Sequence, residues 1–127
     1  MAKKALALIA HDSCKDDLVA WCLSNREHLS HYSLWATGTT GSVVAAKTGL
    51  DIHRVLSGPL GGDLQIGSKI VCGEIDILIF FWDPLASQPH DPDIKALLRV
   101  AALKNIPVAT NQATADLLIA SPLLDGE

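Results

Sequence analysis

The sequence contains few cysteines. Three occur among 127 residues, an odd number, and no two of them have the Cys-x-x-Cys spacing of a zinc or redox motif. This usage is typical of a reducing compartment and gives no metal-binding signature. Cys14, Leu18, Trp21 and Cys22 are spaced at i, i+4, i+7 and i+8, which predicts one helix face. We expect these two thiols to pack in a core rather than to react.

Long hydrophobic runs and an excess of positive charge are also missing. The longest apolar runs, at residues 5–10 and 77–82, are too short for a membrane span or a signal peptide. The formal net charge is −4, whereas a nucleic-acid or anionic membrane partner would require a basic face. The sequence therefore predicts a cytoplasmic protein with no nucleic-acid partner and no membrane partner.

Internal repeats, low-complexity tracts and linkers are absent from the sequence. The length of 127 residues and an apolar content of 49% are sufficient for one domain with a substantial core. We expect a single domain over residues 1–127.

What is present is an alternation of strand-like and helix-like segments. The expected strands cover residues 5–10, 32–36, 53–56, 75–82 and 106–110. Helices are expected from Ser13 to the polar residues 25–27, over 43–48 and 64–72, from Pro92 towards Lys104, and over 113–120. Alternation with short connections predicts an α/β fold in three layers. Its centre is a doubly wound, five-stranded parallel sheet with right-handed crossovers and helices on both faces.

Several residues predict where helices begin and end. Ser13, with Asp16 three residues later, has a capping-box pattern. Asp63 and Asp91 stand where N-caps would stand, and Gly49 follows the second helix in the C′ position.

The most informative stretch is Ala36-Thr37-Gly38-Thr39-Thr40-Gly41, which lies between an expected strand and an expected helix. Glycines allow an anion to approach the backbone, and a new helix directs unpaired N–H groups and its positive end towards that anion. The threonines add hydroxyl donors. Because the Gly-Lys-Ser/Thr of a Walker loop is missing, a nucleoside triphosphate is not supported. Taken alone, the stretch also fits an ordinary turn.

Every expected strand is followed by polar residues. In a parallel sheet, the C-terminal ends of the strands lie at one edge, where ligands bind. The sequence therefore predicts one polar rim, made of His11 and Asp12, residues 37–41, Ser57, Gly58 and Asp63, Asp83 with His90, Asp91 and Asp93, and Thr110 with Asn111.

Each group at this rim has a structural alternative. His11 and Asp12 fit a turn that caps the next helix, Asp63 and Asp91 fit N-caps, and Asp83 fits a turn after a strand. The pattern His90-Asp91-x-Asp93 has the residue types of metal ligands, but no partner cluster is obvious, so we expect no metal. Lys15 is unfavourably placed in the first turn of its helix, and a bound anion would explain it.

Six motifs together resemble those of methylglyoxal synthases. They are His11-Asp-x-x-Lys15, Ala36-Thr-Gly-Thr-Thr-Gly41, Leu56-Ser-Gly-Pro-Leu-Gly-Gly-Asp63, Phe80-Phe-Trp-Asp-Pro84, Pro89-His-Asp-Pro-Asp93 and Thr110-Asn-x-Ala-Thr-Ala-Asp116, in order along nearly the whole chain. The resemblance implies a carbon–oxygen lyase that converts dihydroxyacetone phosphate, a phosphorylated triose, to methylglyoxal and inorganic phosphate. It also implies strand order 3-2-1-4-5, a homohexamer, no cofactor, and inhibition by phosphate.

The resemblance further implies a role for each matching residue. The phosphate would be held by Lys15, Thr37, Gly38, Thr39, Thr40, Ser57 and Gly58. Asp63 would be the catalytic base, His90 would face the substrate oxygens, and His11 would also bind substrate. The supporting carboxylates would be Asp12, Asp83, Asp91 and Asp93. Longer family members carry a C-terminal extension with a basic residue, whereas no Lys or Arg follows Lys104 here, so we expect weakened cooperativity with phosphate.

Two other functions fit part of this pattern. The same fold occurs as the allosteric domain of carbamoyl-phosphate synthetase, so the chain could be a freestanding regulatory module. Such a module needs residues 37–41 but not Asp63 together with His90. A related phospho-sugar isomerase would use similar groups but would release no phosphate.

Overall fold

The apolar run at residues 5–10 becomes β1 (Ala5–Ala10), the central strand of the sheet, and all six of its residues are buried. A strand covered on both faces has apolar side chains on both sides. Leu6, Leu8 and Ala10 pack into one core cluster, whereas Ala5, Ala7 and Ile9 pack into a second cluster on the opposite face. The continuous apolar run therefore supplies two cores at once.

The computed structural model describes residues 4–86 and 91–121 of the chain. The other strands are β2 (Ser33–Ala36), β3 (Ile52–Arg54), β4 (Ile77–Phe81) and β5 (Val108–Ala109). The sheet order is β3-β2-β1-β4-β5 and every neighbouring pair is parallel, which confirms the predicted fold and strand order.

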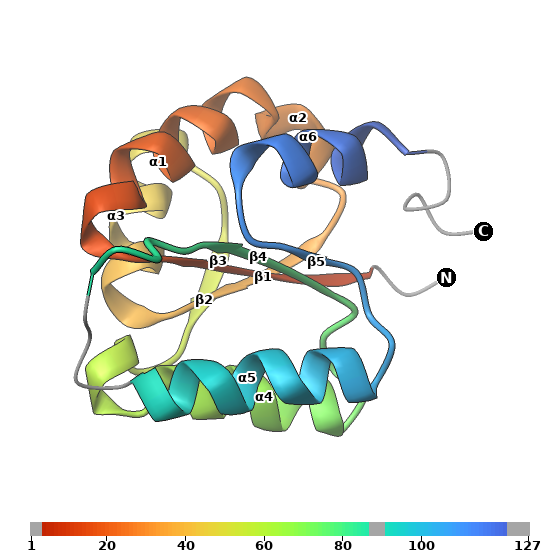
Figure 1. Cartoon of the computed structure of the whole chain (residues 1–127). Helices are drawn as coiled ribbons and strands as arrows, with labels where there is room; N and C mark the ends of the chain where they lie inside the picture. The colour runs from red at the N-terminus through yellow and green to blue at the C-terminus, as the bar shows by residue number, and fades with distance from the viewer. Residues whose placement is uncertain (1–3, 87–90, 122–127) are drawn as a thin grey trace.

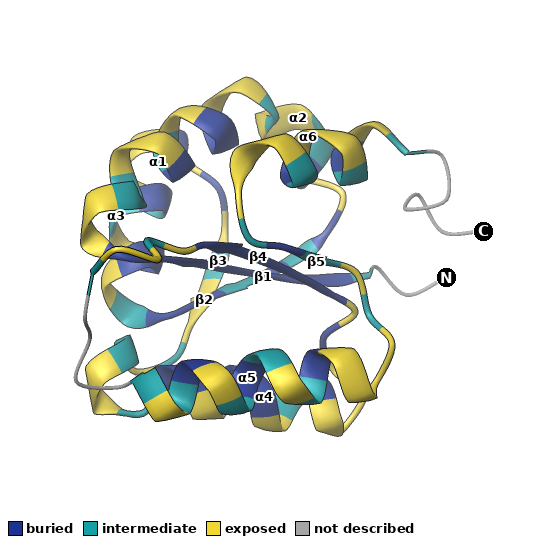
Figure 2. Cartoon of the chain, viewed as in Figure 1, coloured by how far each residue is buried: buried dark blue, intermediate teal, exposed yellow. Residues whose placement is uncertain are grey.

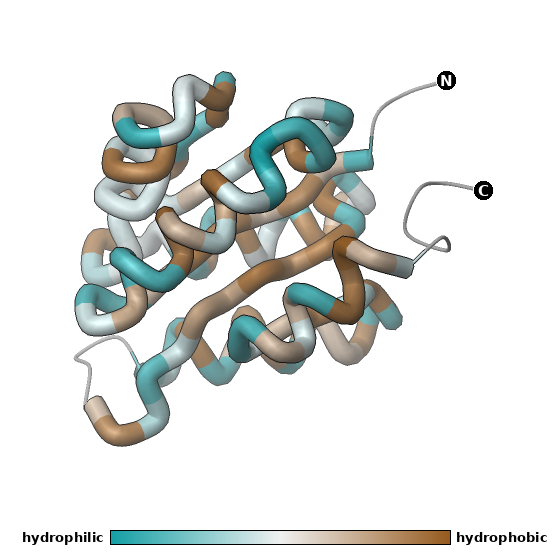
Figure 3. Tube along the Cα trace, turned by 90° about the horizontal axis from the view of Figure 1, so that it is seen from above, coloured by the Kyte–Doolittle hydropathy of each residue, from teal (hydrophilic) through white to brown (hydrophobic). Residues whose placement is uncertain are grey.

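Helices cover both faces of this sheet (Figure 1). One face carries α1 (Lys15–Ser24), α2 (Arg26–Leu29), α3 (Gly38–Thr48) and α6 (Gln112–Ala120). The opposite face carries α4 (Gly62–Val71) and α5 (Asp91–Leu103). Two short 3-10 helices, η1 (Asp12–Cys14) and η2 (Gly58–Leu60), precede α1 and α4. The central strands β1 and β4 are fully buried between the helices, whereas His53 and Arg54 of edge strand β3 are exposed, and the helices have exposed outer faces (Figure 2). Hydrophobic and hydrophilic residues alternate along the helices (Figure 3).

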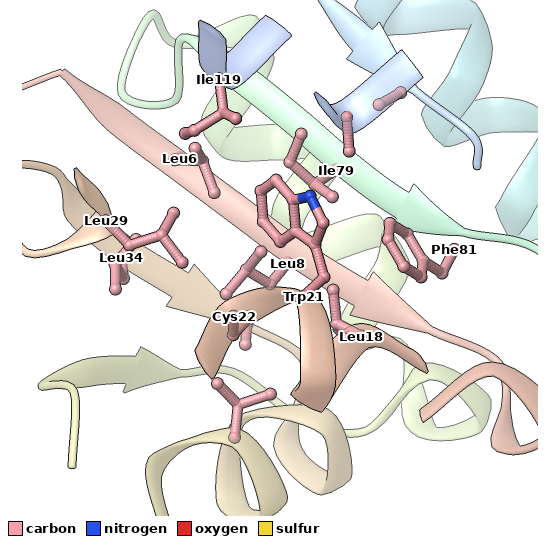
Figure 4. Close-up of a cluster of buried hydrophobic side chains, with 14 of the residues drawn as sticks. Leu6, Leu8, Leu18, Trp21, Cys22, Leu29, Leu34, Ile79, Phe81 and Ile119 are labelled. Atoms are coloured by element: carbon pink, nitrogen blue, oxygen red, sulfur yellow. The ribbon is translucent and has the colours of Figure 1, made fainter. Parts of the chain in front are cut away.

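The predicted apolar face of the first helix is confirmed. Leu18, Trp21 and Cys22 are buried in the core cluster shown in Figure 4, and Cys14 is half-buried against it. Burial raises the pKa of the Cys22 thiol to about 12, because a thiolate would lose its hydration there. The indole Nε1 of Trp21 donates to Asp116 Oδ1 at 2.9 Å, which ties α1 to α6.

Several predicted boundaries are wrong by a few residues. The first helix was expected to run to residues 25–27 but ends at Ser24, before the short α2. The strand expected at 53–56 is β3 at 52–54, and the strand expected at 106–110 has only two residues. Both are edge strands with one neighbour, so their length depends on pairing rather than on local propensity. The helix expected from Pro92 begins at Asp91, one residue earlier.

The predicted capping box at Ser13 is wrong. The N-cap position of α1 is occupied by Cys14, and the Ser13 hydroxyl instead donates to Asp83 Oδ2 at 2.6 Å. Seventy residues separate these partners along the chain, so the contact depends on how β1 and β4 lie side by side.

Within the described ranges, no helix combines the length and the hydropathy needed to cross a bilayer.

Candidate active site

The ends of β1 and β2 and the segment after β3 surround a cavity of about 260 Å³. The cavity brings together nine residues that the sequence placed at the rim or in the phosphate-binding set. They are His11, Asp12, Lys15, Thr37, Thr39, Thr40, Ser57, Gly58 and Asp63, and the remaining wall is Ile9, Ala10 and Pro59. A larger hollow of about 700 Å³ is lined by residues of one short segment, Ser24 to His31. Convergence of distant segments makes the smaller cavity the candidate site.

The stretch rich in threonine and glycine is the start of a helix rather than a turn before one. We predicted a helix from residue 43, but α3 begins at Gly38, with Thr37 as its extended N-cap residue. The Gly41 N–H donates to the Thr37 carbonyl at 2.7 Å, which closes the first turn. Thr39 and Thr40 therefore lie in that turn, where the positive end of the helix favours an anion.

Gly38 does not line the cavity among the described residues. Its N–H donates to the Leu56 carbonyl at 3.2 Å, and Gly38 instead borders a neighbouring hollow beside β3. The structure therefore places Gly38 in the turn that carries Thr39 and Thr40 but outside the described cavity wall, and its role in phosphate binding stays a prediction.

Lys15 lies in the first turn of α1 and points back towards the end of β1. Its Nζ donates to Asp12 Oδ1 at 2.6 Å and to the Ala10 carbonyl at 3.1 Å. The hydrogen bond and the charge of Lys15 hold the pKa of the Asp12 carboxyl below its usual range. The Lys15 side chain is 17% exposed and the Asp12 side chain is 98% exposed, so the ammonium is the enclosed member of the pair and the carboxylate faces solvent at the cavity margin. Asp12 thus accounts for the position of Lys15 even without a bound anion.

Asp63 is not the N-cap that we predicted. The N-cap of α4 is Gly61, whose φ of +100° is a left-handed conformation that favours glycine. Asp63 lies in the first turn of α4 and is only 1% exposed. The sequence therefore identified the residue but not its setting, which is a carboxylate in the cavity wall beside a helix N-terminus.

His11 is 6% exposed and is held on two sides. Its Nδ1 accepts a hydrogen bond from the backbone N–H of Asp83 at 3.0 Å, and its ring meets Phe80 edge to face at 5.3 Å. A neutral imidazole that accepts at Nδ1 carries its proton on Nε2. His11 therefore belongs to the cavity wall as a ring whose donor nitrogen is Nε2.

Asp83 supports the site from outside the cavity. Its carboxylate accepts from Ser13 Oγ at 2.6 Å and from the Leu85 N–H at 3.0 Å. These hydrogen bonds, that of Ser13 first, hold the pKa of Asp83 below its usual range. Its contribution to His11 is made by the backbone N–H, which residue identity alone could not reveal. The sequence reasoning also missed Ser13 as a contact of this group.

The other predicted rim residues lie apart from the described cavity wall. Asp91 and Asp93 are half-buried in the first turn of α5. Asn111 caps α6 by accepting from the Thr114 N–H at 2.9 Å, and the Thr110 carbonyl accepts from the Trp82 N–H at 3.4 Å. His90 lies outside the described residues. Across the described part of the chain, no three His, Cys, Asp or Glu side chains gather as a metal site.

Comparison with known proteins places this arrangement in context. A family model described as an MGS-like domain matches residues 17–110. The chain is 60% identical over 125 residues to a methylglyoxal synthase of Proteus mirabilis, covering 98% of this chain and 82% of that protein. It is 58% identical over 121 residues to a methylglyoxal synthase of Cellvibrio japonicus, covering 95% and 79%. The crystal structure of methylglyoxal synthase from Elizabethkingia anophelis matches with a TM-score of 0.92 at 49% identity, covering 97% and 81%.

Proposed function

The chain belongs to the methylglyoxal synthase family, and from this we propose that it converts dihydroxyacetone phosphate to methylglyoxal and inorganic phosphate. One observation carries the proposal. A buried carboxylate, Asp63, shares a cavity of about 260 Å³ with the N-terminal threonines of α3 and with Lys15. A base and an anion-binding helix end in one small cavity suit a small phosphate ester whose reaction starts by losing a proton.

The phosphate would lie at the start of α3. Thr39 and Thr40 line the cavity there, Ser57 and Gly58 line it from η2, and Lys15 supplies a positive charge from α1. Helix N–H groups and a cation stabilise the ester dianion, and they stabilise the additional charge that develops when phosphate leaves. Inorganic phosphate would occupy the same position and inhibit.

Asp63 would remove the proton from the hydroxymethyl carbon. The electron pair of that C–H bond moves into the enediolate, whose negative charge develops on the former carbonyl oxygen. The enediolate then expels phosphate from the neighbouring carbon while its hydroxyl proton passes to the phosphate, and the resulting enolate takes up one proton at its methylene carbon, in place of the one removed by Asp63, to give methylglyoxal. A carboxylate is a weak base, so groups that stabilise the enediolate must supply much of the rate.

Two histidines would stabilise that oxygen. His11 would donate from Nε2, because its Nδ1 is occupied by the Asp83 N–H. His90 is assigned to the substrate oxygens by its family motif. Neutral imidazoles suit this task, since a neutral ring can still donate one hydrogen bond to an oxyanion.

The groups that hold the phosphate at the start of α3 would also determine whether the reaction ends in elimination or in reprotonation. Phosphate leaves readily only when its C–O bond stands perpendicular to the enediolate plane, where the σ* orbital overlaps the π system. An isomerase must hold the same bond in the plane. The hydrogen bonds that orient the phosphate would therefore favour elimination over reprotonation.

The direct test is to incubate the purified protein with dihydroxyacetone phosphate and to measure both free phosphate and dicarbonyl. We expect the two products in equal amounts, with inhibition by added phosphate. An isomerase would consume substrate without releasing phosphate, and a regulatory module would bind phosphate without forming either product. Either result would contradict the proposed function.

Thr40→Val should change the ratio of elimination to simple proton exchange. The Thr40 hydroxyl is buried in the first turn of α3, 3.4 Å from the Ala10 carbonyl, so it can turn to a phosphate oxygen. Valine keeps the shape and removes the donor, and a lost hydrogen bond to a charged group costs roughly 1.5–3 kcal/mol. In deuterated water, we expect more label in recovered substrate per methylglyoxal formed, together with a lower kcat.

The matched control is Thr48→Val, at the opposite end of the same helix, where the hydroxyl donates to the Val44 carbonyl at 2.7 Å. This control should leave the labelling ratio unchanged. If Thr40→Val also leaves the ratio unchanged and raises only KM, then Thr40 binds phosphate without setting its angle.

We also propose that the protein is a homohexamer. The family resemblance motivates this expectation, and several large apolar side chains remain exposed on one copy, including Leu85 at 95% and Leu117 at 75%. Symmetric assemblies can cover apolar surface that is exposed on a single copy. Light scattering at micromolar concentration should give six times the mass of the chain, and a stable monomer would contradict the assembly.

A further inference from the structure

Ser13 is exposed and lies outside the cavity wall, yet two hydrogen bonds connect it with His11. Its hydroxyl donates to Asp83 Oδ2 at 2.6 Å. The backbone N–H of the same aspartate donates to Nδ1 of His11 at 3.0 Å. A side chain on the segment after β1 therefore contacts the residue that determines which nitrogen of His11 carries the proton.

The two oxygens of Asp83 hold two different parts of the chain. Oδ1 accepts from the Leu85 N–H at 3.0 Å, and the Asp83 carbonyl accepts from the Ala86 N–H at 3.3 Å, so these bonds close a turn after β4. Oδ2 accepts from Ser13 and ties that turn to η1. The Ser13 hydrogen bond is also the largest of the effects that hold the pKa of Asp83 below its usual range, so its acceptor is a carboxylate anion.

The sheet brings these segments together. Ala10 of β1 is in register with Phe81 of β4, and the His11 N–H donates to the Phe81 carbonyl at 3.1 Å. His11 and Asp83 thus leave adjacent parallel strands at the same level. Beyond this last backbone bond, two described side-chain contacts join the outgoing segments: the bond from the Asp83 N–H to His11 Nδ1, and the bond from the Ser13 hydroxyl to the Asp83 carboxylate.

We propose that Ser13 is a positioning residue for the reaction. By anchoring the Asp83 turn, it keeps the Asp83 N–H directed at Nδ1 of His11 and so keeps the proton of the neutral ring on Nε2. His11 then faces the substrate oxygen with a hydrogen-bond donor. An unprotonated Nε2 would instead direct its lone pair at the developing oxyanion, and the two would repel each other. This inference rests on the proposed function.

The first test is kinetic. Ser13→Ala should lower kcat roughly tenfold, the lower end of what the loss of one hydrogen bond to a charged group costs. KM should stay within about twofold, because Ser13 does not touch the phosphate position. Ser13→Thr keeps the hydroxyl and should restore kcat. Ser42→Ala is the matched control, since the Ser42 hydroxyl is also exposed and accepts from a charged partner, Arg54 Nη1, at 2.6 Å.

The second test reads the tautomer itself, which a merely structural role would not move. In protein labelled with ¹⁵N at histidine, His11 should show an unprotonated Nδ1 and a protonated Nε2, with the signal assigned by its loss in His11→Gln. Ser13→Ala should add a population with the proton on Nδ1, and Ser42→Ala should not. Thermal melting of each variant will report whether the fold is retained.

Three results would overturn the proposal: an unchanged kcat in Ser13→Ala, a lowered kcat with the wild-type tautomer, or failure of Ser13→Thr to restore the rate. The tautomer measurement uses no substrate. If the wild-type protein forms no methylglyoxal, the proposed function fails. In that case the ¹⁵N spectra alone test whether Ser13 controls the tautomer of His11. The proposed role of Ser13 in the reaction would be contradicted together with the proposed function.

Discussion

Replacing Asp63 by asparagine should lower the turnover of dihydroxyacetone phosphate by about a hundredfold or more, the range expected when a general base is lost. Asparagine has nearly the same shape and keeps an acceptor oxygen, so the first turn of α4 should survive. A carboxylate does not stabilise a bound phosphate, because both groups are negatively charged. The affinity for inorganic phosphate should therefore stay within a few-fold, and calorimetry can measure it.

The same variant should also stop exchanging the substrate proton in deuterated water, since the base acts before phosphate leaves. Asp76→Asn is a suitable control, because Asp76 lies beyond the opposite ends of the strands and accepts from the Ala5 N–H at 2.9 Å. Asp76→Asn makes the same carboxylate-to-amide change at a position away from the cavity, so this variant should keep nearly full activity. Loss of a general base typically lowers the rate by about a hundredfold or more. If Asp63→Asn retains more than about a tenth of the wild-type rate, then Asp63 is not the base.

Gly62→Ala should disrupt both the fold and the phosphate position. A Cβ at Gly62 would lie 1.9 Å from the Leu56 carbonyl oxygen and 2.9 Å from the Ser57 carbonyl carbon. These are backbone atoms, and the Gly62 N–H also donates to the Ser57 carbonyl at 3.0 Å, so the segment before η2 would have to move. We expect a loss of about 3 kcal/mol, the upper end for overpacking, and a melting temperature lower by roughly 10 °C.

Gly67→Ala, in the same helix, is the matched control. A Cβ there would meet Val100 and Leu97 at 3.6–4.0 Å, which is ordinary contact distance. Alanine is the better helix former, so this variant should melt at or slightly above the wild-type temperature. Gly62→Ala should also bind phosphate more weakly than Gly67→Ala, because Ser57 and Gly58 move with the displaced segment. Equal melting temperatures for the two variants would contradict the close approach at Gly62.

The sequence by itself determined the sheet and much of the cavity wall. The apolar runs that became β1 and β4 are typical of strands buried on both faces, and their alternation with helices favours a parallel sheet. Once the strands are parallel, their C-terminal ends share one edge. His11, Thr40 and Ser57 were therefore predicted to meet, although they are far apart in the chain.

The tertiary structure alone decided how these residues are held. Local patterns favoured Ser13 as a cap and Asp63 as an N-cap, because a short polar side chain before a helix usually bonds to its own backbone. In the folded chain, Ser13 instead bonds to Asp83, and Asp63 lies within the buried first turn of α4. Which partner a polar side chain takes depends on what the fold brings within about 3 Å of it, and no local sequence pattern encodes that distance.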